Sequence, residues 1–256
     1  MFKKILTLLM SMALILSLTA CGGGSTTVKV TNEDGSTQTV VLESLKPQLQ
    51  NVTPMTDYAG NTSIDQMDYV TFGLDENSQP IEWIVLEKSN NKALLLSKYV
   101  LTSHTYNDES VDITWENCTM RKWLNSEYIN TIFSKKEQGS IITSDVINNV
   151  INYGNAEYGT KGGNNTKDKL FLLSLDEVNK YFNNDNQRVA TNKGDSSSSW
   201  WLRSPGLSPD NWWLPSPDID QSQAAYIYYD GSLRENGGDV NTYGGHGVRP
   251  ALWVKY

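Results

Sequence analysis

Residues that could support acid–base, nucleophilic or metal chemistry are sparse in this chain. Its only histidines are His104 and His246, and its only cysteines are Cys21 and Cys118. These four residues lie far apart in the sequence and lack the close spacing of a zinc site. No Gly-x-Ser-x-Gly motif is present, which argues against a serine hydrolase of the nucleophile-elbow type. The sequence therefore predicts a domain without a catalytic set.

Acidic residues offer one weak metal-binding pattern. Asp218, Asp220 and Ser222 alternate as in loops whose side-chain oxygens surround calcium. The pattern lacks the glycine at the sixth position and the glutamate at the twelfth position of an EF-hand loop. A solvated acidic loop is the simpler interpretation. We therefore expect no cofactor, with calcium as the alternative.

Aromatic residues with polar tips are more informative. The chain has 8 Trp and 13 Tyr but only 5 Phe. Trp and Tyr join an apolar ring to a hydrogen-bonding group, so they suit wet binding surfaces as well as the core beneath loops. Trp212 and Trp213 are expected to be the best exposed pair. The predicted ligand-binding residues are Asp210, Asn211, Trp212, Trp213, Tyr228 and Tyr243, with Tyr226 and Tyr229 in the same aromatic set.

Other residues are expected to be structural. Arg203 and Arg249 lie in strands among apolar residues, where arginine usually binds loop carbonyls or a carboxylate, with an anionic ligand as the alternative. Trp200 and Trp201 point to opposite faces of a strand, so one of them is expected in the core. Cys118 is expected to be a buried free thiol. The predicted structural set is Trp123, Trp201, Arg203 and Arg249.

The amino terminus has the features of an export signal. Lys3 and Lys4 precede an apolar run over residues 5–18, which is shorter than the about 20 residues of a membrane-spanning helix. Leu18-Thr19-Ala20-Cys21 resembles the lipobox of bacterial lipoproteins. The resemblance implies cleavage before Cys21, lipid on its sulfur, and a chain anchored to the bacterial membrane outside the cytoplasm. An ordinary cleaved signal and an uncleaved anchor are the alternatives.

The chain is expected to have three parts, which are a signal peptide at residues 1–20, a lipidated tether with a β-hairpin at residues 21–67, and one domain at residues 68–256. Alternating strand residues at 28–31 and 37–42 around an Asp-Gly turn predict the hairpin. The net charge of −8 becomes still more negative when the two lysines of the signal are removed. Such an acidic chain is a poor candidate for binding nucleic acid.

Strands and long loops alternate over much of the predicted domain. Strands are expected at residues 69–73, 81–87, 92–100, 169–173, 200–203, 224–229, 232–234 and 248–254. The first three form a meander, and Asp230-Gly231 joins two later strands as a hairpin. Long loops inside a compact domain are often functional. Residues 183–199, 207–223 and 236–247 are therefore expected to form the ligand-binding face.

Two helical regions are expected. Apolar residues recur at helical spacing over Thr114–Phe133, with Thr114 as the N-cap and a break at Asn125-Ser126. Ser174 and Glu177 form a capping box that opens a helix to about Phe182. Asp176 and Glu177 are adjacent carboxylates, but helix capping accounts for Glu177. We therefore assign this pair no catalytic role.

Four short segments in the same order resemble an uncharacterised family of bacterial extracytoplasmic domains over about residues 68–254. These segments are Trp115–Leu124, Phe171–Glu177, Trp200–Gly206 and Gly247–Leu252. The last two are also similar to the closing segments of C-type-lectin-like domains, in the branch that includes formylglycine-generating enzymes. That similarity implies an α+β fold with paired N- and C-terminal strands, two helices flanking a twisted sheet, and long ligand-binding loops.

The chain departs from these relatives in its chemistry. The formylglycine-generating activity needs a cysteine pair, whereas the predicted domain has Cys118 alone. The Glu-Pro-Asn, Gln-Pro-Asp and Trp-Asn-Asp motifs of calcium-dependent lectins are absent. We therefore expect a surface-anchored lipoprotein with a non-catalytic domain that binds a glycan or a protein. An exported enzyme acting on cell-wall or extracellular polymer, and a structural envelope protein, are the alternatives.

Overall fold

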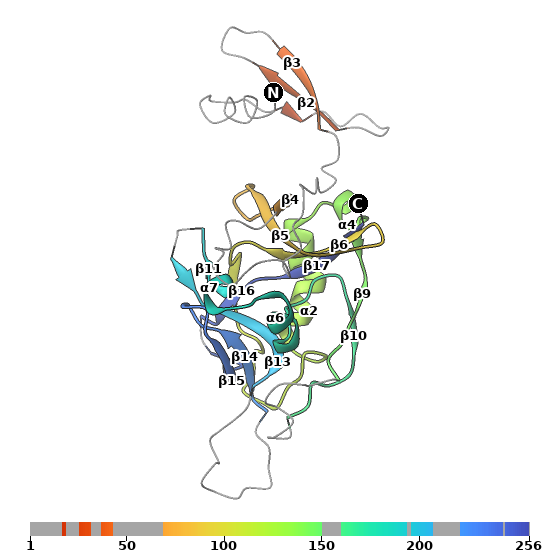
Figure 1. The fold of residues 1–256 in the computed structure, drawn as a ribbon. Coiled ribbons are helices and arrows are strands. Elements are labelled where there is room, and N and C mark those ends of the chain that lie inside the picture. Colours follow the sequence, from red (N-terminus) through yellow and green to blue (C-terminus); the bar gives the residue numbers. More distant parts are fainter. Residues whose placement is uncertain are drawn as a thin grey trace, which may run out of the picture. The chain divides into compact units, whose positions relative to one another are not determined.

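The computed structural model describes residues 69–149, 160–193, 196–206, 221–242 and 244–255, together with three strands near the amino terminus. The chain divides into two compact units, residues 1–45 and residues 46–256. The second unit contains mixed α and β structure with small sheets and short helices (Figure 1). The predicted α+β class is therefore confirmed.

The first unit contains a three-stranded sheet. Its strands are β1 (Ser17–Leu18), β2 (Thr26–Thr31) and β3 (Thr37–Leu42). Antiparallel pairing of β2 with β3 places Thr31 opposite Thr37, so the predicted hairpin is confirmed. The predicted processing and lipidation site, Cys21, lies outside the described residues.

The predicted meander forms the first five-stranded sheet of the second unit. Its strands in spatial order are β4 (Tyr69–Leu74), β5 (Pro80–Ser89), β6 (Lys92–Ser97), β17 (Ala251–Lys255) and β8 (Ile141–Ile142), all antiparallel to their neighbours. Strand β6 ends earlier than predicted because Ser97 Oγ donates to the Tyr99 carbonyl at 2.9 Å and closes a turn. The last strand pairs with β6 and β8 rather than with β4, so the expected pairing of N- and C-terminal strands is wrong.

A second five-stranded sheet carries the candidate site. Its strands in spatial order are β15 (Leu233–Asp239), β14 (Gln223–Ile227), β13 (Trp200–Pro205), β16 (His246–Val248) and β7 (Thr102–His104). Only β13 and β16 are parallel within this sheet. The predicted hairpin around Asp230-Gly231 is confirmed as β14 and β15.

The single strand predicted at residues 248–254 is wrong, because this segment contributes to both sheets. Strand β16 ends at Val248, and β17 begins at Ala251. Pro250 has no N–H group and cannot continue a hydrogen-bonded ladder. Its carbonyl instead accepts from the Ser97 N–H at 3.0 Å. The chain therefore crosses from one sheet to the other at Arg249-Pro250.

The predicted helix at Thr114–Phe133 begins later than expected. Cys118 is the N-cap, and its Sγ accepts from the Arg121 N–H at 3.4 Å. The Thr114 carbonyl accepts from the Cys118 N–H at 3.1 Å and closes a turn, so Thr114 is not the N-cap. The segments are α2 (Thr119–Trp123), the π-helical η3 (Leu124–Tyr128) and α3 (Ile129–Ile132).

The expected break at Asn125-Ser126 is a π-helical turn instead. Asn125 donates through Nδ2 to the Leu170 carbonyl at 2.8 Å, and its Oδ1 accepts from the Lys169 N–H at 2.8 Å. These tertiary hydrogen bonds support an irregular turn without interrupting the helix. The predicted strand at residues 169–173 is reduced to one bridge between Phe171 and Ala251.

The remaining helices and strands are short. They are α4 (Lys135–Gln138), α6 (Leu175–Tyr181), α7 (Asp185–Arg188), and the strand pairs β9 (Ser144–Val146) with β10 (Thr166–Asp168) and β11 (Ala190–Thr191) with β12 (Ser197–Ser198). The predicted capping box of Ser174 and Glu177 opens α6 and is confirmed.

Tryptophans lie at the centre of the hydrophobic core. Trp83, Trp115, Trp200 and Trp201 are all fully buried. Both faces of β13 are therefore covered, which exceeds the expectation that only one of its two tryptophans is in the core. The buried pair holds β13 rigidly in the middle of the second sheet.

Candidate functional site

The site is built on the hairpin of β14 and β15. At its turn, the Tyr228 N–H donates to the Ser232 carbonyl, and the Gly231 N–H donates to the Tyr228 carbonyl, both at 2.9 Å. Gly231 has a φ of +85°, and a Cβ there would lie 1.9 Å from the Asp185 carbonyl oxygen. The turn therefore needs glycine at this position. Alternation along the strand then directs Tyr226 and Tyr228 to the same face.

A row of rings covers this face, and we call Tyr226, Tyr228 and His246 the ring face. The His246 imidazole stacks on Tyr226 with centroids 4.0 Å apart and planes tilted by 15°. Trp201 lies beneath both rings and meets His246 edge-on at 4.4 Å. Tyr228 lies 6.4 Å from Tyr226. A buried indole thus supports half-buried polar rings, which is the arrangement of a preformed binding platform.

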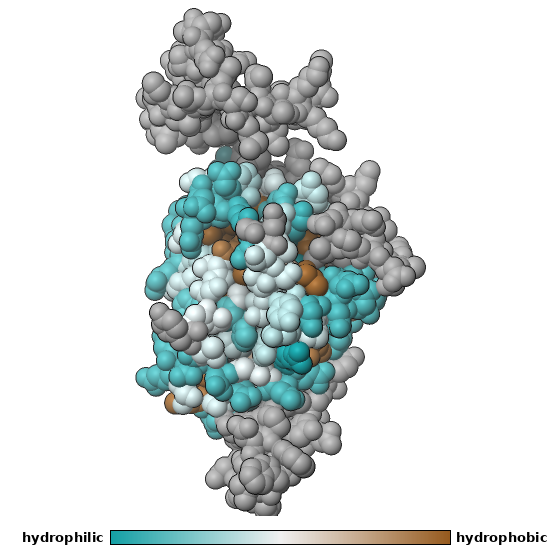
Figure 2. Space-filling view, turned by 90° about the vertical axis from the view of Figure 1, so that its left-hand side faces the viewer, coloured by the Kyte–Doolittle hydropathy of each residue, from teal (hydrophilic) through white to brown (hydrophobic). Residues whose placement is uncertain are grey.

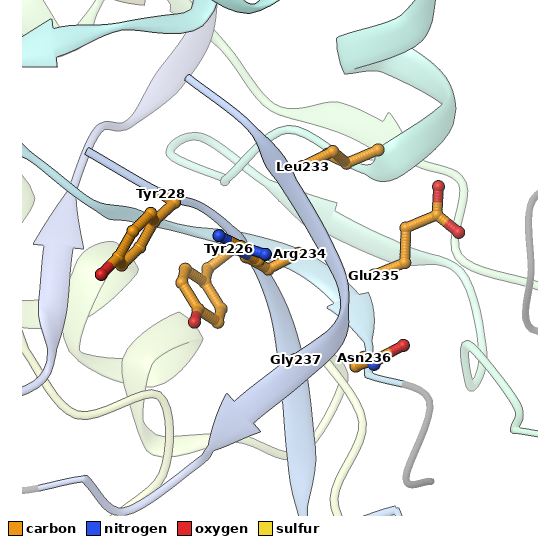
Figure 3. Close-up of a pocket in the computed structure, with 7 residues that line it drawn as sticks. All are labelled: Tyr226, Tyr228, Leu233, Arg234, Glu235, Asn236 and Gly237. Atoms are coloured by element: carbon orange, nitrogen blue, oxygen red, sulfur yellow. The ribbon is translucent and has the colours of Figure 1, made fainter. Parts of the chain in front are cut away.

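A pocket of about 580 Å³ opens beside the ring face, within the usual range of small-molecule sites. Its lining residues are Tyr226, Tyr228, Leu233, Arg234, Glu235, Asn236 and Gly237. Figure 3 shows Tyr226, Tyr228 and Arg234 together on one side of β15, with Glu235 pointing to the other side. The Arg234 guanidinium lies over the Tyr228 ring, 4.8 Å from its centroid. The pocket therefore combines ring faces with a cation.

The surface on this side of the molecule is mostly hydrophilic or of intermediate hydropathy, with a few hydrophobic spots (Figure 2). Figure 2 shows the side that carries β11 and β15 in Figure 1, with a broad area of intermediate hydropathy among hydrophilic residues. Tyrosine, serine and glycine have this intermediate character. Such a surface suits a hydroxyl-rich ligand better than a hydrophobic one.

His246 is held in its neutral form. Burial lowers its pKa to about 4. Its Nδ1 lies 2.7 Å from Ser199 Oγ, so the two groups share a hydrogen bond. A Cβ on Gly238 would lie 3.1 Å from His246 Nε2, which places the second ring nitrogen against the backbone of β15. At neutral pH the ring is therefore an uncharged stacking partner of Tyr226.

A comparison with known domain families identifies the family of this chain. Residues 90–256 match the model of a domain of unknown function, DUF6273. The chain belongs to the DUF6273 family. No curated protein and no solved structure matches it. The DUF6273 domain contains both the ring face and the pocket, because every residue that forms them lies within the matched range.

The structure brings only part of the predicted ligand-binding set together. Tyr228 lines the pocket of the DUF6273 domain, together with Tyr226 from the wider aromatic set. Ser222 is described, and its carbonyl accepts from the Val240 N–H at 3.0 Å. The other predicted ligand or calcium residues lie outside the described residues, and they are Asp210, Asn211, Trp212, Trp213, Asp218, Asp220 and Tyr243.

Sequence reasoning missed Arg234 and His246 as parts of the site of the DUF6273 domain. Arg234 follows the predicted turn by only a few residues, and its pairing with Tyr226 across the hairpin could have been derived from that turn. His246 reaches Tyr226 only because β16 pairs with β13, a contact between distant segments. No local pattern indicates that contact.

Residues expected to be structural make extensive contacts in the DUF6273 domain. Arg203 is buried and pairs with Glu177 through both guanidinium ends. Arg249 is fully buried, donates through Nε to the Ser97 carbonyl at 2.8 Å, and lies 4.9 Å from the Trp200 ring centroid. Desolvation lowers the pKa of Arg249 to about 9.

A second aromatic row begins at His104 on β7. His104 stacks on Trp123 at 4.4 Å, and Trp123 stacks on Tyr128 at the same distance. Trp123 is half-buried. This row packs α2 and η3 of the DUF6273 domain against β7, so it anchors the edge of the second sheet.

The potential metal ligands and the thiol of the DUF6273 domain can be placed only where the structure describes them. No group of three or more potential histidine, cysteine, aspartate or glutamate ligands comes together among the described residues. Cys118 is fully buried, and desolvation raises the pKa of its thiol to about 12. In the same part of the chain, no helix has the length and apolar character needed to cross a membrane.

Proposed function

We propose that this DUF6273 protein is a surface-anchored lipoprotein whose domain binds glycans through the ring face. The observation that carries the proposal is the stacking of His246 and Tyr226 over buried Trp201, beside the pocket that Tyr228 and Arg234 line. Flat aromatic faces pack against the apolar faces of sugar rings. Neighbouring polar groups can then bind sugar hydroxyls, as in pockets that combine rings with a few placed polar groups.

Anchoring is the second element of the proposal. The lipobox-like sequence before Cys21 supports lipidation and an extracytoplasmic location. A lipid anchor would hold the domain near the cell envelope, where polysaccharides are abundant ligands. We also propose a C-type-lectin-like relationship for the fold, on the strength of the segments Trp200–Gly206 and Gly247–Leu252. That relationship implies that the N- and C-terminal strands pair with each other, whereas β17 pairs with β6 and β8.

A glycan array probed with the purified full-length chain tests the proposal. The expected result is retention on a limited set of glycans, with at least about tenfold weaker retention of a Tyr226→Ala variant. Tyr69→Ala is the matched control, because Tyr69 is a partly exposed tyrosine on β4 of the other large sheet. Retention that is equal for the two variants would reject the ring face as the binding surface.

A second candidate function is hydrolysis by an exported enzyme. The 2.7 Å contact between Ser199 Oγ and His246 Nδ1 is the observation that favours it. The low pKa of His246 counts against it, because general bases work best when their pKa lies near the working pH. Labelling by a fluorophosphonate that is lost in Ser199→Ala would support hydrolysis. An unlabelled chain would leave the binding role in place.

A further inference from the structure

We infer that the glycan bound by the ring face is anionic and that Arg234 recognises its acidic group. This inference rests on the proposed glycan-binding function and narrows it to one chemical class. The inference starts from the hydrogen-bonding partners of the five arginines of the chain, all of which lie in the described residues. Four of them have hydrogen-bonding partners among those residues, and Arg234 does not.

The four partnered arginines use their guanidinium groups within the fold. Arg121 and Arg203 bind carboxylates, Arg188 binds both a carboxylate and a carbonyl, and Arg249 binds carbonyls. Arg234 forms no hydrogen bond or ion pair with any other described residue, and its only ring contact there is with Tyr228. No other described residue therefore uses its five N–H donors, and the side chain is exposed.

The position of Arg234 makes these donors useful to a ligand. Arg234 lies directly opposite Tyr226 in the pairing of β14 and β15. Its guanidinium lies over the Tyr228 ring, 4.8 Å from the centroid, and this contact limits the rotamers that binding would have to freeze. A planar, pre-oriented guanidinium forms paired hydrogen bonds with carboxylate or phosphate oxygens. An acidic group on a sugar that rests on the ring face would lie within its reach.

No carboxylate in the described part of the chain forms an ion pair with this cation. Glu235 belongs to the same pocket, but Figure 3 shows its side chain on the opposite side of β15 from Tyr226 and Arg234. The Asp230 carboxylate accepts from the Ser232 N–H at 2.9 Å in the hairpin turn, and hydrogen bonds to Ser232 lower its pKa, with a smaller contribution from the charge of Arg234. Neither residue forms an ion pair with Arg234 among those that the structure describes.

The shape of the site favours a saccharide over an acidic peptide. The pocket has a volume of about 580 Å³ and lies beside successive polar rings, which can pack against the faces of a sugar. A carboxylate-bearing sugar and a phosphate-bearing sugar share the required chemistry. Amidation with a carbodiimide and an amine separates the two, because it neutralises carboxylates and leaves phosphates charged.

The experiment uses a glycan array with neutral, uronic-acid, muramic-acid, sialic-acid and phosphorylated members, read before and after amidation. The full-length chain is compared with Arg234→Gln and Arg234→Lys. Lys167→Gln is the control, because Lys167 is an exposed cation on β10 and its removal changes the net charge equally. Thermal melting of each variant confirms that the fold is kept.

The expected result is retention of acidic glycans by the unaltered chain and the control. Amidation should weaken retention of carboxylated members about tenfold, and Arg234→Gln should cause the same loss with no further effect of amidation. Arg234→Lys should recover part of the binding. Arg234-dependent retention confined to phosphorylated members, and unaffected by amidation, would assign the acidic group to phosphate.

Other results would overturn the inference. If the unaltered chain and Arg234→Gln retain the same neutral glycans equally, the ring face binds sugars but Arg234 does not select an anion. If no glycan is retained and a polyaspartate peptide binds in an Arg234-dependent way, both the inference and the proposed function fail.

Discussion

His104 on β7 and His246 on β16 are direct partners across these two strands. The pairing joins segments from opposite ends of the domain. The His246 ring stacks on Tyr226, whereas the His104 ring stacks on Trp123. One strand pair therefore supports both the ring face and the aromatic row that fixes α2. The geometry of the turn before His246 should control the position of the ring face.

Substitutions at Gly244 and Gly245 test this control. Gly245 has a φ of +55°, and a Cβ there would lie 2.1 Å from the His104 carbonyl oxygen. Gly244 has a φ of +78°, but a Cβ at that position would have no neighbouring atom within 4 Å among the described residues. We expect Gly244→Ala to cost about 1 kcal/mol from backbone strain alone and Gly245→Ala at least about 2 kcal/mol more. Urea unfolding measures both, and equal costs would contradict the close approach of the strands.

The pH dependence of stability should reflect His246. The pKa of this residue is about 4 in the folded chain, compared with an ordinary value of 6.5. The unfolded chain therefore binds a proton between these values while the folded chain does not. Stability is complete above about pH 6.5 and is lost as the pH falls toward 4. The expected loss is about 2 kcal/mol, after allowance for the partial exposure of the ring.

His246→Phe is the matched variant for that measurement. It keeps a ring that can stack on Tyr226 and removes the titrating group, and His104 is present in both chains. The free energy of unfolding should depend less on pH in this variant over the same interval. A pH dependence identical to that of the unaltered chain would show that His246 does not titrate as its burial requires.

The ion pair of buried Arg203 with Glu177 should contribute strongly to stability. Arg203 also donates to the oxygens of Asn148, Leu172 and Ile147. Arg203→Met removes a buried donor from these three oxygens and from the partly exposed Glu177 carboxylate, so it should cost about 3–5 kcal/mol. Arg234→Met should change stability by less than about 0.5 kcal/mol, because its guanidinium is exposed. Similar losses for the two variants, measured by denaturant unfolding, would contradict this division of roles.

Thiol labelling should report the burial of Cys118. In a Cys21→Ser chain, Cys118 is the only cysteine. Its thiol is fully buried and has a pKa of about 12, so a maleimide should fail to label the native chain at about pH 8. One thiol per chain should become reactive in concentrated guanidinium. Rapid labelling of the native chain would show that the helix capped by Cys118 opens readily.

The sequence predicted those parts of the fold that depend on local signals. The capping box at Ser174 and the Asp230-Gly231 hairpin are examples, because each is defined by residues a few positions apart. The start of α2 was misplaced, since a cysteine thiol rarely serves as an N-cap and Thr114 is a better N-cap by type. The crossing of the chain from one sheet to the other at Arg249-Pro250 depends on hydrogen-bond partners that are distant in the sequence. A local sequence pattern therefore does not predict it.

The candidate site was predicted only in part for the same reason. Aromatic composition directed attention to Tyr228 and its neighbours, which do line the pocket. The contribution of His246 required the pairing of β16 with β13, and the importance of Arg234 depends on the partners of the other four arginines. Trp212 and Trp213 stay predictions as ligand-binding residues.

The central claim is that the ring face of the second sheet is the ligand-binding surface. Titration calorimetry with the best-retained glycan of the array tests it most directly, with Tyr226→Ala and Tyr69→Ala compared at equal folded fraction. The account predicts that Tyr226→Ala weakens binding at least about tenfold while Tyr69→Ala leaves it unchanged. Unchanged affinity in folded Tyr226→Ala would contradict the account.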